Sequence, residues 1–260
     1  MASAAGSLRP IHGAVATVGV SDRITFLRKT YAHLGVALIA FAAITGGMMR
    51  FAPMASLKFS SWALGGWHWM LVMGLFMLVG WLAERLAMSE SSRGLQYAGL
   101  GIFVTAEAVL LQPLLWILMI RFGGPEVRAE ILRTGTPIMT GVAASILMQA
   151  IVITLTIFIG LTLVVFLTKK DFSFMRGILT ICSFAALGVI IASFAFGFSL
   201  GALFCGAMIL LMAGYILFQT SVIMKAFPPT AYVAAALMLF STIATLFWYV
   251  LQLLMSLRRD

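Results

Sequence analysis

The feature that most constrains this chain is an uncharged stretch that runs from Gly177 to Met224. The hydrocarbon core of a bilayer is about 30 Å thick, and a helix needs about 20 apolar residues to cross it. The stretch is too long for one crossing and suits two helices, with a tight turn at Gly197-Phe-Ser-Leu-Gly201. Backbone polar groups find no water inside a membrane, so each crossing must be helical. This stretch alone predicts a polytopic helical membrane protein.

The rest of the chain follows the same pattern, since 62% of its 260 residues are hydrophobic and only 10% are charged. We expect an all-α polytopic membrane protein. Residues 50–61 should form a short loop, Pro113 should interrupt the third span, and 121–137 should form a short surface helix or an ordered loop. The predicted parts are a flexible N-terminal tail over 1–30, seven transmembrane helices at about 31–49, 62–82, 95–120, 142–168, 178–196, 200–224 and 231–257, and a C-terminal tail over 258–260.

The charges predict an orientation rather than a polyanionic partner. The net charge of +9 comes from 17 basic and 8 acidic residues, and nearly all the basic ones lie in tails and loops. Membrane topology requires this distribution, so we expect no nucleic-acid partner. Ten basic residues fall on the side of the N-terminus and seven on the other side. This bias favours a cytoplasmic N-terminus.

One acidic residue, Glu107, lies in the middle of a predicted span. A carboxyl group at that depth is expensive, so it should be neutral, paired or beside water. Ionisable residues within membranes indicate function, such as a proton site or a cation ligand. The structural alternative is a protonated glutamate that is hydrogen-bonded to a hydroxyl on a neighbouring helix.

The last two predicted helices carry polar side chains inside apolar runs. Those of the final helix recur at about one helical turn and form a stripe. Polar groups in hydrocarbon need partners, so we expect the final helix to lie inside the bundle, with Gln219 facing the stripe. Ordinary helix–helix hydrogen bonds explain single Ser and Thr residues, whereas the cluster favours a functional locus. This polar core comprises Gln219, Thr220, Ser221, Ser241, Thr242 and Thr245, with Tyr249 and Gln252 further along the stripe.

The sequence lacks the common catalytic motifs. It has no HExxH motif, no nucleophile elbow and no phosphate loop, and its predicted spans contain no aspartate. Two cysteines without metal spacing, and His33 and His68 far apart in the chain, do not suggest a metal site. We therefore expect neither an enzyme nor a bound cofactor or metal.

Three stretches, taken together, are distinctive: Phe26-Leu-Arg-Lys-Thr-Tyr31; Phe158-Ile-Gly-Leu-Thr-Leu-Val-Val-Phe-Leu-Thr-Lys-Lys-Asp-Phe-Ser-Phe174; and Leu217-Phe-Gln-Thr-Ser-Val-Ile223 followed by Tyr232-Val-Ala-Ala-Ala-Leu-Met-Leu-Phe240. They resemble the Bax inhibitor family (the TMBIM/YccA group), in register over about 26–257. The motif loop contains Lys169, Lys170 and Asp171. From its position, Asp171 could cap the next helix while the lysines anchor at lipid headgroups.

The resemblance implies a seven-helix bundle with the last helix in the centre. It also implies roles in stress protection, in calcium or proton leak and, in bacterial members, in restraining an ATP-dependent membrane protease. Glu107 looks like the glutamate of the family's third span, although Ala108 and Gln112 replace its usual glycines. Leak-competent relatives carry an aspartate in each of the last two helices, where this chain has Gln219 and Thr242. Neither side chain titrates, so the resemblance does not extend to a leak that is gated by pH through a carboxylate pair. The bacterial, protease-modulating branch also lacks the full pair of aspartates, and this chain resembles that branch more closely.

We therefore predict a non-enzymatic stress-response modulator in a bacterial inner membrane. It would bind a membrane protease or another membrane protein through its N-terminal tail and the 121–137 segment, with the lipid bilayer as its other partner. The alternative is a calcium or proton leak channel with an altered pH latch, in which Ca²⁺ or H⁺ passes Glu107, Gln219 and Thr242. A structural membrane protein without transport is the third alternative.

Overall fold

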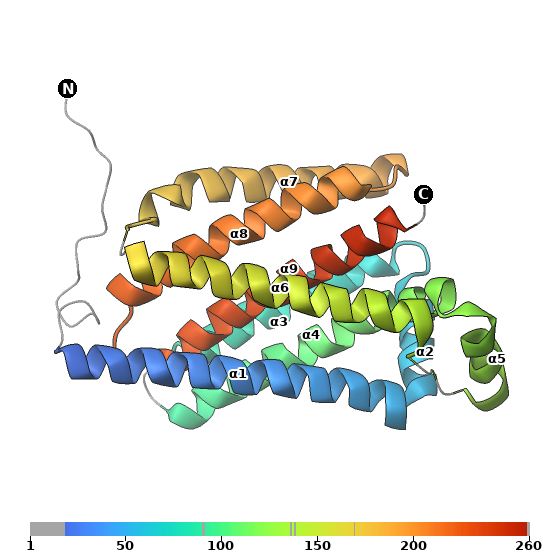
Figure 1. The fold of residues 1–260 in the computed structure, drawn as a ribbon, viewed down its shortest axis with the longest axis horizontal. Coiled ribbons are helices and arrows are strands. Elements are labelled where there is room, and N and C mark those ends of the chain that lie inside the picture. Colours follow the sequence, from blue (N-terminus) through green and yellow to red (C-terminus); the bar gives the residue numbers. More distant parts are fainter. Residues whose placement is uncertain (1–18, 90–91, 136, 138, 169, 259–260) are drawn as a thin grey trace. The chain divides into compact units, whose positions relative to one another are not determined.

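The computed structural model describes residues 19–89, 92–135, 137, 139–168 and 170–258 (Figure 1). Within these residues it contains nine α-helices, one short 3-10 helix and no strand. Seven helical segments are long and apolar enough to cross a membrane. The all-α architecture with seven spans, predicted from the sequence, is thereby confirmed.

The spans are formed by α1 (Val20–Phe51), α3 (His68–Ala87), α4 (Arg93–Phe122), α6 (Gly141–Thr168), η2 (Ser173–Met175) with α7 (Arg176–Phe196), α8 (Ala202–Lys225) and α9 (Tyr232–Leu257). Two shorter helices, α2 (Pro53–Ala63) and α5 (Gly124–Thr134), lie between spans. Of the two alternatives predicted for 121–137, the structure has the helix, and it ends at Gly135 in the left-handed conformation, with φ of 68°.

The first helix begins earlier than the sequence suggests. It starts at Val20, within the stretch expected to be a flexible tail, and residues 1–18 lie outside the described part of the chain. Asp22 stands in the first turn, where a negative charge interacts favourably with the helix dipole. Phe26 is only 1% exposed. Burial of this ring explains why the polar residues before Tyr31 remain helical.

A helix, α2, also replaces the loop expected at 50–61. Pro53 lies in its first turn, where a fixed φ and a missing N–H are tolerated. The small residues Ser56, Ser60 and Ala63 recur at helical spacing and are buried. Trp62 consequently belongs to α2, and the second span begins at His68.

Pro113 does not interrupt α4, which continues to Phe122. A proline inside a helix removes one backbone hydrogen bond, and in membranes neighbouring groups often compensate. Here the carbonyl that loses its helical partner is that of Val109, four residues before Pro113. The Gln112 amide nitrogen donates instead to the carbonyl oxygens of Ala108 (3.0 Å) and Thr45 (3.4 Å) and does not replace that bond. The prediction of an interruption was wrong because the residues around Pro113, from Leu111 to Trp116, are buried, and tertiary packing holds the helix together.

The chain divides into two compact units. The first comprises Met1–Thr30 and Gln149–Asp260, and the second comprises Tyr31–Met148. Within the first unit, α8 packs along α9, and α7 packs on α8 (Figure 1). Within the second, α3 packs along α4, and α2 contacts both.

Burial differs greatly among the spans. In the most apolar stretch of each span, the buried share ranges from 6% in Ser173–Phe196 to 72% in Tyr232–Leu257. The high burial of α9 is what an enclosed final helix requires. The low burial of α7 suits contact with lipid.

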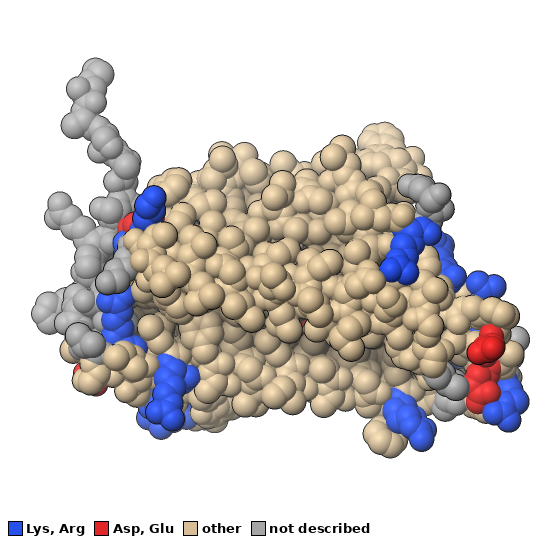
Figure 2. Space-filling model, in the orientation of Figure 1, with Lys and Arg blue, Asp and Glu red and all other residues tan. Residues whose placement is uncertain are grey.

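Charged side chains lie mainly towards the helix ends. On the face presented in Figure 2, blue and red side chains gather near those ends, and the broad stretch between them is almost wholly tan. An uncharged belt of this kind suits the hydrocarbon core, with the basic side chains at headgroup level.

Candidate functional site

The polar residues of α8 and α9 meet at a buried hydrogen bond. Thr242 Oγ1 donates to Gln219 Oε1 over 2.8 Å. Both side chains are buried, and the Thr242 hydroxyl also lies 3.3 Å from the carbonyl oxygen of Met238. Because neither side chain ionises near neutral pH, this contact has no charge that pH could change.

Further along, the stripe of α9 continues to face α8. The Cys205 thiol lies 3.7 Å from Gln252 Oε1, and the rings of Phe204 and Tyr249 meet edge-to-face with centroids 6.0 Å apart. These contacts lie at successive levels of the α8–α9 pair. This part of the stripe therefore serves the packing of two antiparallel helices.

Two members of the predicted polar core make local bonds instead. The Ser241 hydroxyl donates to the carbonyl oxygen of Met238 over 2.9 Å, and the Thr245 hydroxyl donates to that of Ser241 over 2.8 Å. Both hydroxyls are thus satisfied by their own helix. They need no ligand to remain half-buried in an apolar environment.

Gln219, Thr220 and Ser221 are neighbours in sequence but have different surroundings, because successive helical residues point about 100° apart. Gln219 faces α9, whereas the buried hydroxyl of Thr220 has no hydrogen-bond partner among the described residues. Ser221 Oγ accepts a bond from the Phe172 N–H (3.1 Å) and lies 3.3 Å from Asp171 Oδ1 as a donor. The predicted cluster is therefore divided between two sites.

The second site is the loop between α6 and η2, where Asp171 joins three partners. Its Oδ1 accepts from the Ser173 N–H over 2.9 Å, which closes a local turn before η2. The N-caps of η2 and α7 are Phe172 and Met175, and neither makes a side-chain capping bond, so Asp171 is a turn residue and not the helix cap that its position suggested. Its Oδ2 lies 2.8 Å from Lys225 Nζ at the end of α8. We call Asp171, Ser221 and Lys225 the loop clamp. Of the two motif lysines, Lys170 is exposed, and Lys169 lies outside the described residues.

The loop clamp holds a charged carboxylate. Partial burial raises the pKa of Asp171, but hydrogen bonds from Lys225 and Ser173, together with the charge of Lys225, outweigh this and lower the pKa to about 2. Asp171 is therefore ionised at any physiological pH. Sequence reasoning missed Lys225 as its partner, because a basic residue in the last turn of a helix has a sufficient local explanation.

Glu107 lies in α4 of the second unit and is 7% exposed. Its neighbours one turn away on the same helix face, Val104 and Leu111, are buried and apolar. Among the described residues, no hydrogen bond or ion pair of its carboxyl group is found. The group can therefore act only where water or a cation reaches it.

A buried network that the sequence did not reveal also lies in the second unit. Ser56 Oγ donates to Gln112 Oε1 over 2.7 Å and accepts from Trp116 Nε1 over 2.9 Å. All three residues are at most 1% exposed. The network joins α2 to α4. Its one sequence signal is the helical spacing of Gln112 and Trp116, and Ser56 was missed because its segment was expected to be a loop.

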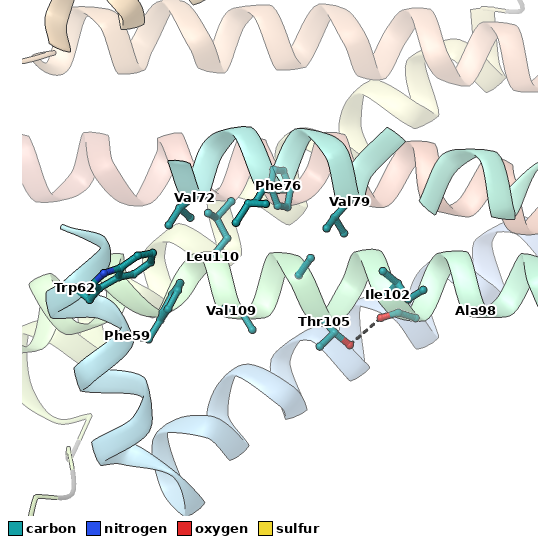
Figure 3. Close-up of a pocket in the computed structure, with 13 residues that line it drawn as sticks. Phe59, Trp62, Val72, Phe76, Val79, Ala98, Ile102, Thr105, Val109 and Leu110 are labelled. Carbon is teal, nitrogen blue, oxygen red and sulfur yellow. Dashed lines mark hydrogen bonds between the residues drawn. The ribbon is translucent and has the colours of Figure 1, made fainter. Parts of the chain in front are cut away.

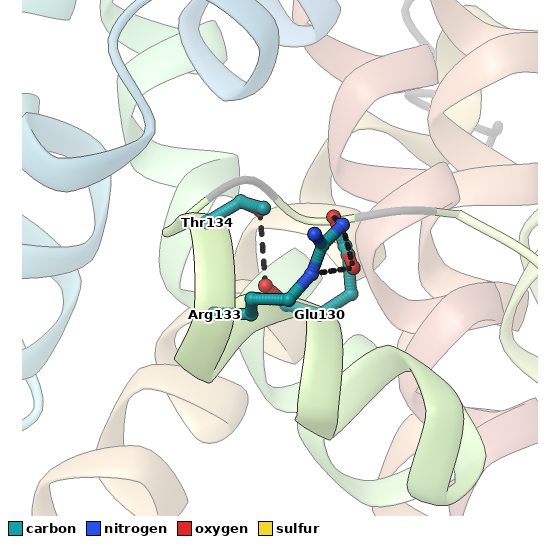
Figure 4. A network of polar contacts seen from close by, with 3 residues as sticks. All are labelled: Glu130, Arg133 and Thr134. Carbon is teal, nitrogen blue, oxygen red and sulfur yellow. Dashed lines mark hydrogen bonds and ion pairs between the residues drawn. The ribbon is translucent and has the colours of Figure 1, made fainter.

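Outside the spans, α5 presents charge at the surface. The Arg133 guanidinium pairs with the Glu130 carboxylate over 2.9 Å, and the Thr134 hydroxyl donates to the Glu130 carbonyl oxygen (Figure 4). Arg128 Nε donates to the carbonyl oxygen of Ile120 over 2.8 Å, which ties α5 to the end of α4. Glu126 is exposed on the same helix. The result is an anchored helix with an accessible polar face.

Groups of three or more His, Cys, Asp or Glu side chains that could hold a metal are absent from the described residues. His33 Nε2 lies 3.0 Å from the Tyr97 hydroxyl, and His68 Nδ1 lies 3.0 Å from the carbonyl oxygen of Trp62. Each imidazole thus has a hydrogen-bonding neighbour that explains its position.

The family model described as "Inhibitor of apoptosis-promoting Bax1" matches residues 23–259. The chain belongs to the Bax inhibitor family. A curated member, Bax inhibitor 1 of Schizosaccharomyces pombe (strain 972 / ATCC 24843), is 29% identical over 252 residues, which cover 95% of this chain and 82% of that protein. The resemblance inferred from the three motifs is confirmed. This member of the Bax inhibitor family is an integral membrane protein, and the family is not known for enzymes.

Proposed function

We propose that this protein is a non-enzymatic modulator of stress responses that acts by binding other membrane proteins, such as an ATP-dependent membrane protease. The observation that carries the proposal is α5, an anchored helix outside the spans whose exposed charges Glu126 and Arg133 suit a protein partner. We place the protein in a bacterial inner membrane with its N-terminus in the cytoplasm, on the positive-inside bias of its loops.

Topology limits what such a partner can be. Three spans, α1, α3 and α4, separate the N-terminal tail from α5. Because the number of crossings is odd, we infer that the tail and α5 face opposite sides of the membrane. A partner that contacts both must itself span the bilayer, which favours an integral membrane protein over a soluble one.

The test is co-purification of the protease from membranes that contain the full-length protein. Reversing both exposed charges of α5 with Glu126→Lys and Arg133→Glu leaves the net charge unchanged, and we expect recovery of the protease to fall about tenfold, as for loss of central interface contacts. Glu84→Lys is the matched control, because Glu84 is an exposed carboxylate on the other side of the membrane. If removal of residues 1–25 and the α5 variant both leave every partner in place, the proposal fails.

A second candidate, a calcium or proton leak, is favoured by the buried carboxyl group of Glu107, which has no partner among the described residues. The neutral Gln219–Thr242 pair counts against a leak with a carboxylate pH latch. Flux of Ca²⁺ and H⁺ into liposomes at roughly pH 6 and pH 8 tests the idea. A leak through Glu107 should disappear in Glu107→Gln and persist in Glu84→Gln, which makes the same change outside the hydrocarbon core. Flux no higher than in empty liposomes, with folded protein, would exclude the leak.

A further inference from the structure

The second unit contains a cavity of about 680 Å³ between α2, α3 and α4 (Figure 3). Its lining is apolar, with Phe59 and Trp62 from α2, Phe76 from α3 and Val109 from α4. Thr105 contributes a hydroxyl, but this group already donates to the carbonyl oxygen of Gly101 over 2.8 Å. The volume lies within the range of about 300–1,000 Å³ that is typical of ligand sites.

The cavity opens on a surface that faces hydrocarbon. Two of its lining residues, Leu75 of α3 and Ile102 of α4, are 55% and 41% exposed, and both helices are candidate spans. Water is a poor occupant because it needs two to four polar partners. An apolar groove at membrane depth is therefore filled by an apolar chain.

The length of the groove matches one leaflet. Its lining on α4 extends from Ala98 to Leu110, which corresponds to about 18 Å at about 1.5 Å per residue. One leaflet contributes about half of the roughly 30 Å hydrocarbon core. A single lipid acyl chain that enters from one interface would thus run along most of the groove.

One end of the groove has the character of a headgroup site. Trp62 lies there (Figure 3) and is 45% exposed. Its ring is stacked on that of His68 at a centroid distance of 4.9 Å. Tryptophan favours the membrane–water interface. Lys58 is exposed one helical turn before Trp62, on the same face of α2, and forms no ion pair within the described part of the chain. A phosphate at this end would meet a cation.

From this geometry, we propose that the groove binds one acyl chain of an anionic glycerophospholipid of the surrounding bilayer, with the phosphate at Lys58. The groove does not involve Glu107, the loop clamp or α5, so the proposal is independent of the proposed function. It assigns the apolar lining to the chain and Lys58 to the preference for a negative headgroup.

The test uses phosphatidylglycerol with a photoactivatable group near the end of one acyl chain, in lipid nanodiscs that contain the full-length protein. After irradiation, labelled residues are mapped by mass spectrometry. We expect labelling to concentrate on the groove side chains of α3 and α4. Excess unlabelled phosphatidylglycerol should reduce labelling there more than on α7, which is exposed to bulk lipid.

A side chain that fills the groove should exclude the acyl chain. Gly101 lines the groove, and a Cβ atom added there meets nothing within 4 Å. Gly101→Leu therefore extends a side chain from open space into the groove, and we expect groove labelling to fall at least fivefold. Gly74→Leu on α3 is the matched control, because Gly74 also has open space around it but does not line the groove. The competition experiment needs no variant, so it decides the question even if Gly101→Leu misfolds.

The headgroup part is tested by Lys58→Gln. In the parent protein, phosphatidylglycerol should label the groove several times more than phosphatidylcholine with the same chains, and the variant should lose this preference while both lipids still label the groove. Equal labelling by the two lipids in the parent overturns the role of Lys58. Three other results would refute the lipid site in the groove. They are labelling spread evenly over all exposed spans, equal labelling of Gly101→Leu and Gly74→Leu, and crosslinks to another protein instead of lipid.

Discussion

Replacement of Asp171 by asparagine is the sharpest test of the loop clamp. The asparagine side chain would keep an oxygen for the Ser173 N–H, because its amide oxygen accepts a hydrogen bond and asparagine forms the same local turn as aspartate. It would lose the ion pair with Lys225 Nζ, which lies 2.8 Å from the carboxylate. The substitution therefore separates the charge of Asp171 from its hydrogen bond to the Ser173 N–H.

The structure sets the size of the effect. The fall in the pKa of Asp171 from 3.8 to about 2 corresponds to about 2.5 kcal/mol of folding free energy at neutral pH. The side chains of Lys225 and Asp171 are 32% and 25% exposed, so solvent screening reduces the contribution to about 1–1.5 kcal/mol. We expect Asp171→Asn to lower the free energy of unfolding by that amount. Asp171→Ala should cost about 1 kcal/mol more, because it also removes the hydrogen bond to the Ser173 N–H.

The pH dependence has a defined sign. The pKa of Asp171 is lower in the folded protein, so its stabilisation is complete above about pH 4 and is lost as pH falls through about 2. Between pH 7 and pH 5, Asp171 should contribute no change in stability. The difference between the parent and Asp171→Asn should shrink only below about pH 4.

Equilibrium unfolding in detergent micelles, followed by circular dichroism, measures these differences. A double-mutant cycle with Lys225→Gln isolates the pair, with an expected coupling of about 1 kcal/mol. A coupling near zero, or a difference between parent and Asp171→Asn that vanishes between pH 7 and pH 5, would refute the reasoning.

Two further predictions concern packing in the second unit, and both are measured by unfolding in micelles. Ser56→Ala leaves Gln112 Oε1 and Trp116 Nε1 without their buried partner and should lower the free energy of unfolding by about 1–2 kcal/mol. The control, Ser60→Ala on the same helix, removes a buried hydroxyl that has no partner among the described residues and should change stability little. Equal effects of the two substitutions would contradict the network. Gly99→Ala places a Cβ atom 2.5 Å from the carbonyl oxygen of Ala83. It should push α3 away from α4 and lower the free energy of unfolding by about 1–3 kcal/mol. The control, Gly101→Ala, has open space around the added atom and should be neutral or stabilising.

The sequence predicts the spans well because their signal is long and physical. A run of about 20 apolar residues has few alternatives to a membrane helix, so each predicted span overlaps a helix in the structure. The errors lie where short-range signals compete. Pro53 suggests a loop but begins α2, and Pro113 suggests a break but leaves α4 continuous. Pro53 is tolerated because it lies in the first turn of α2, whereas Pro113 lies inside α4 among buried residues whose packing holds the helix together. The proline itself reveals neither context.

The contacts of the polar residues are likewise predicted only in part. Helical spacing identifies the α9 stripe, and the structure brings Gln219 and Thr242 together. Spacing cannot show that Ser221 turns towards the loop after α6, or that Ser56 meets Gln112 and Trp116. These partners lie far apart in the chain, and their contacts depend on how helices pack rather than on any local pattern.

The placement of charge leaves few ways for this protein to sense pH. The pair between α8 and α9 is neutral, and the loop clamp titrates near pH 2, so neither changes state under physiological conditions. Glu107 is the acidic residue left in the middle of a span, and no partner among the described residues fixes its charge. A response to pH that a carboxyl group within the spans carries should therefore disappear in Glu107→Gln. If the response survives that substitution, Glu107 is not the group that carries it.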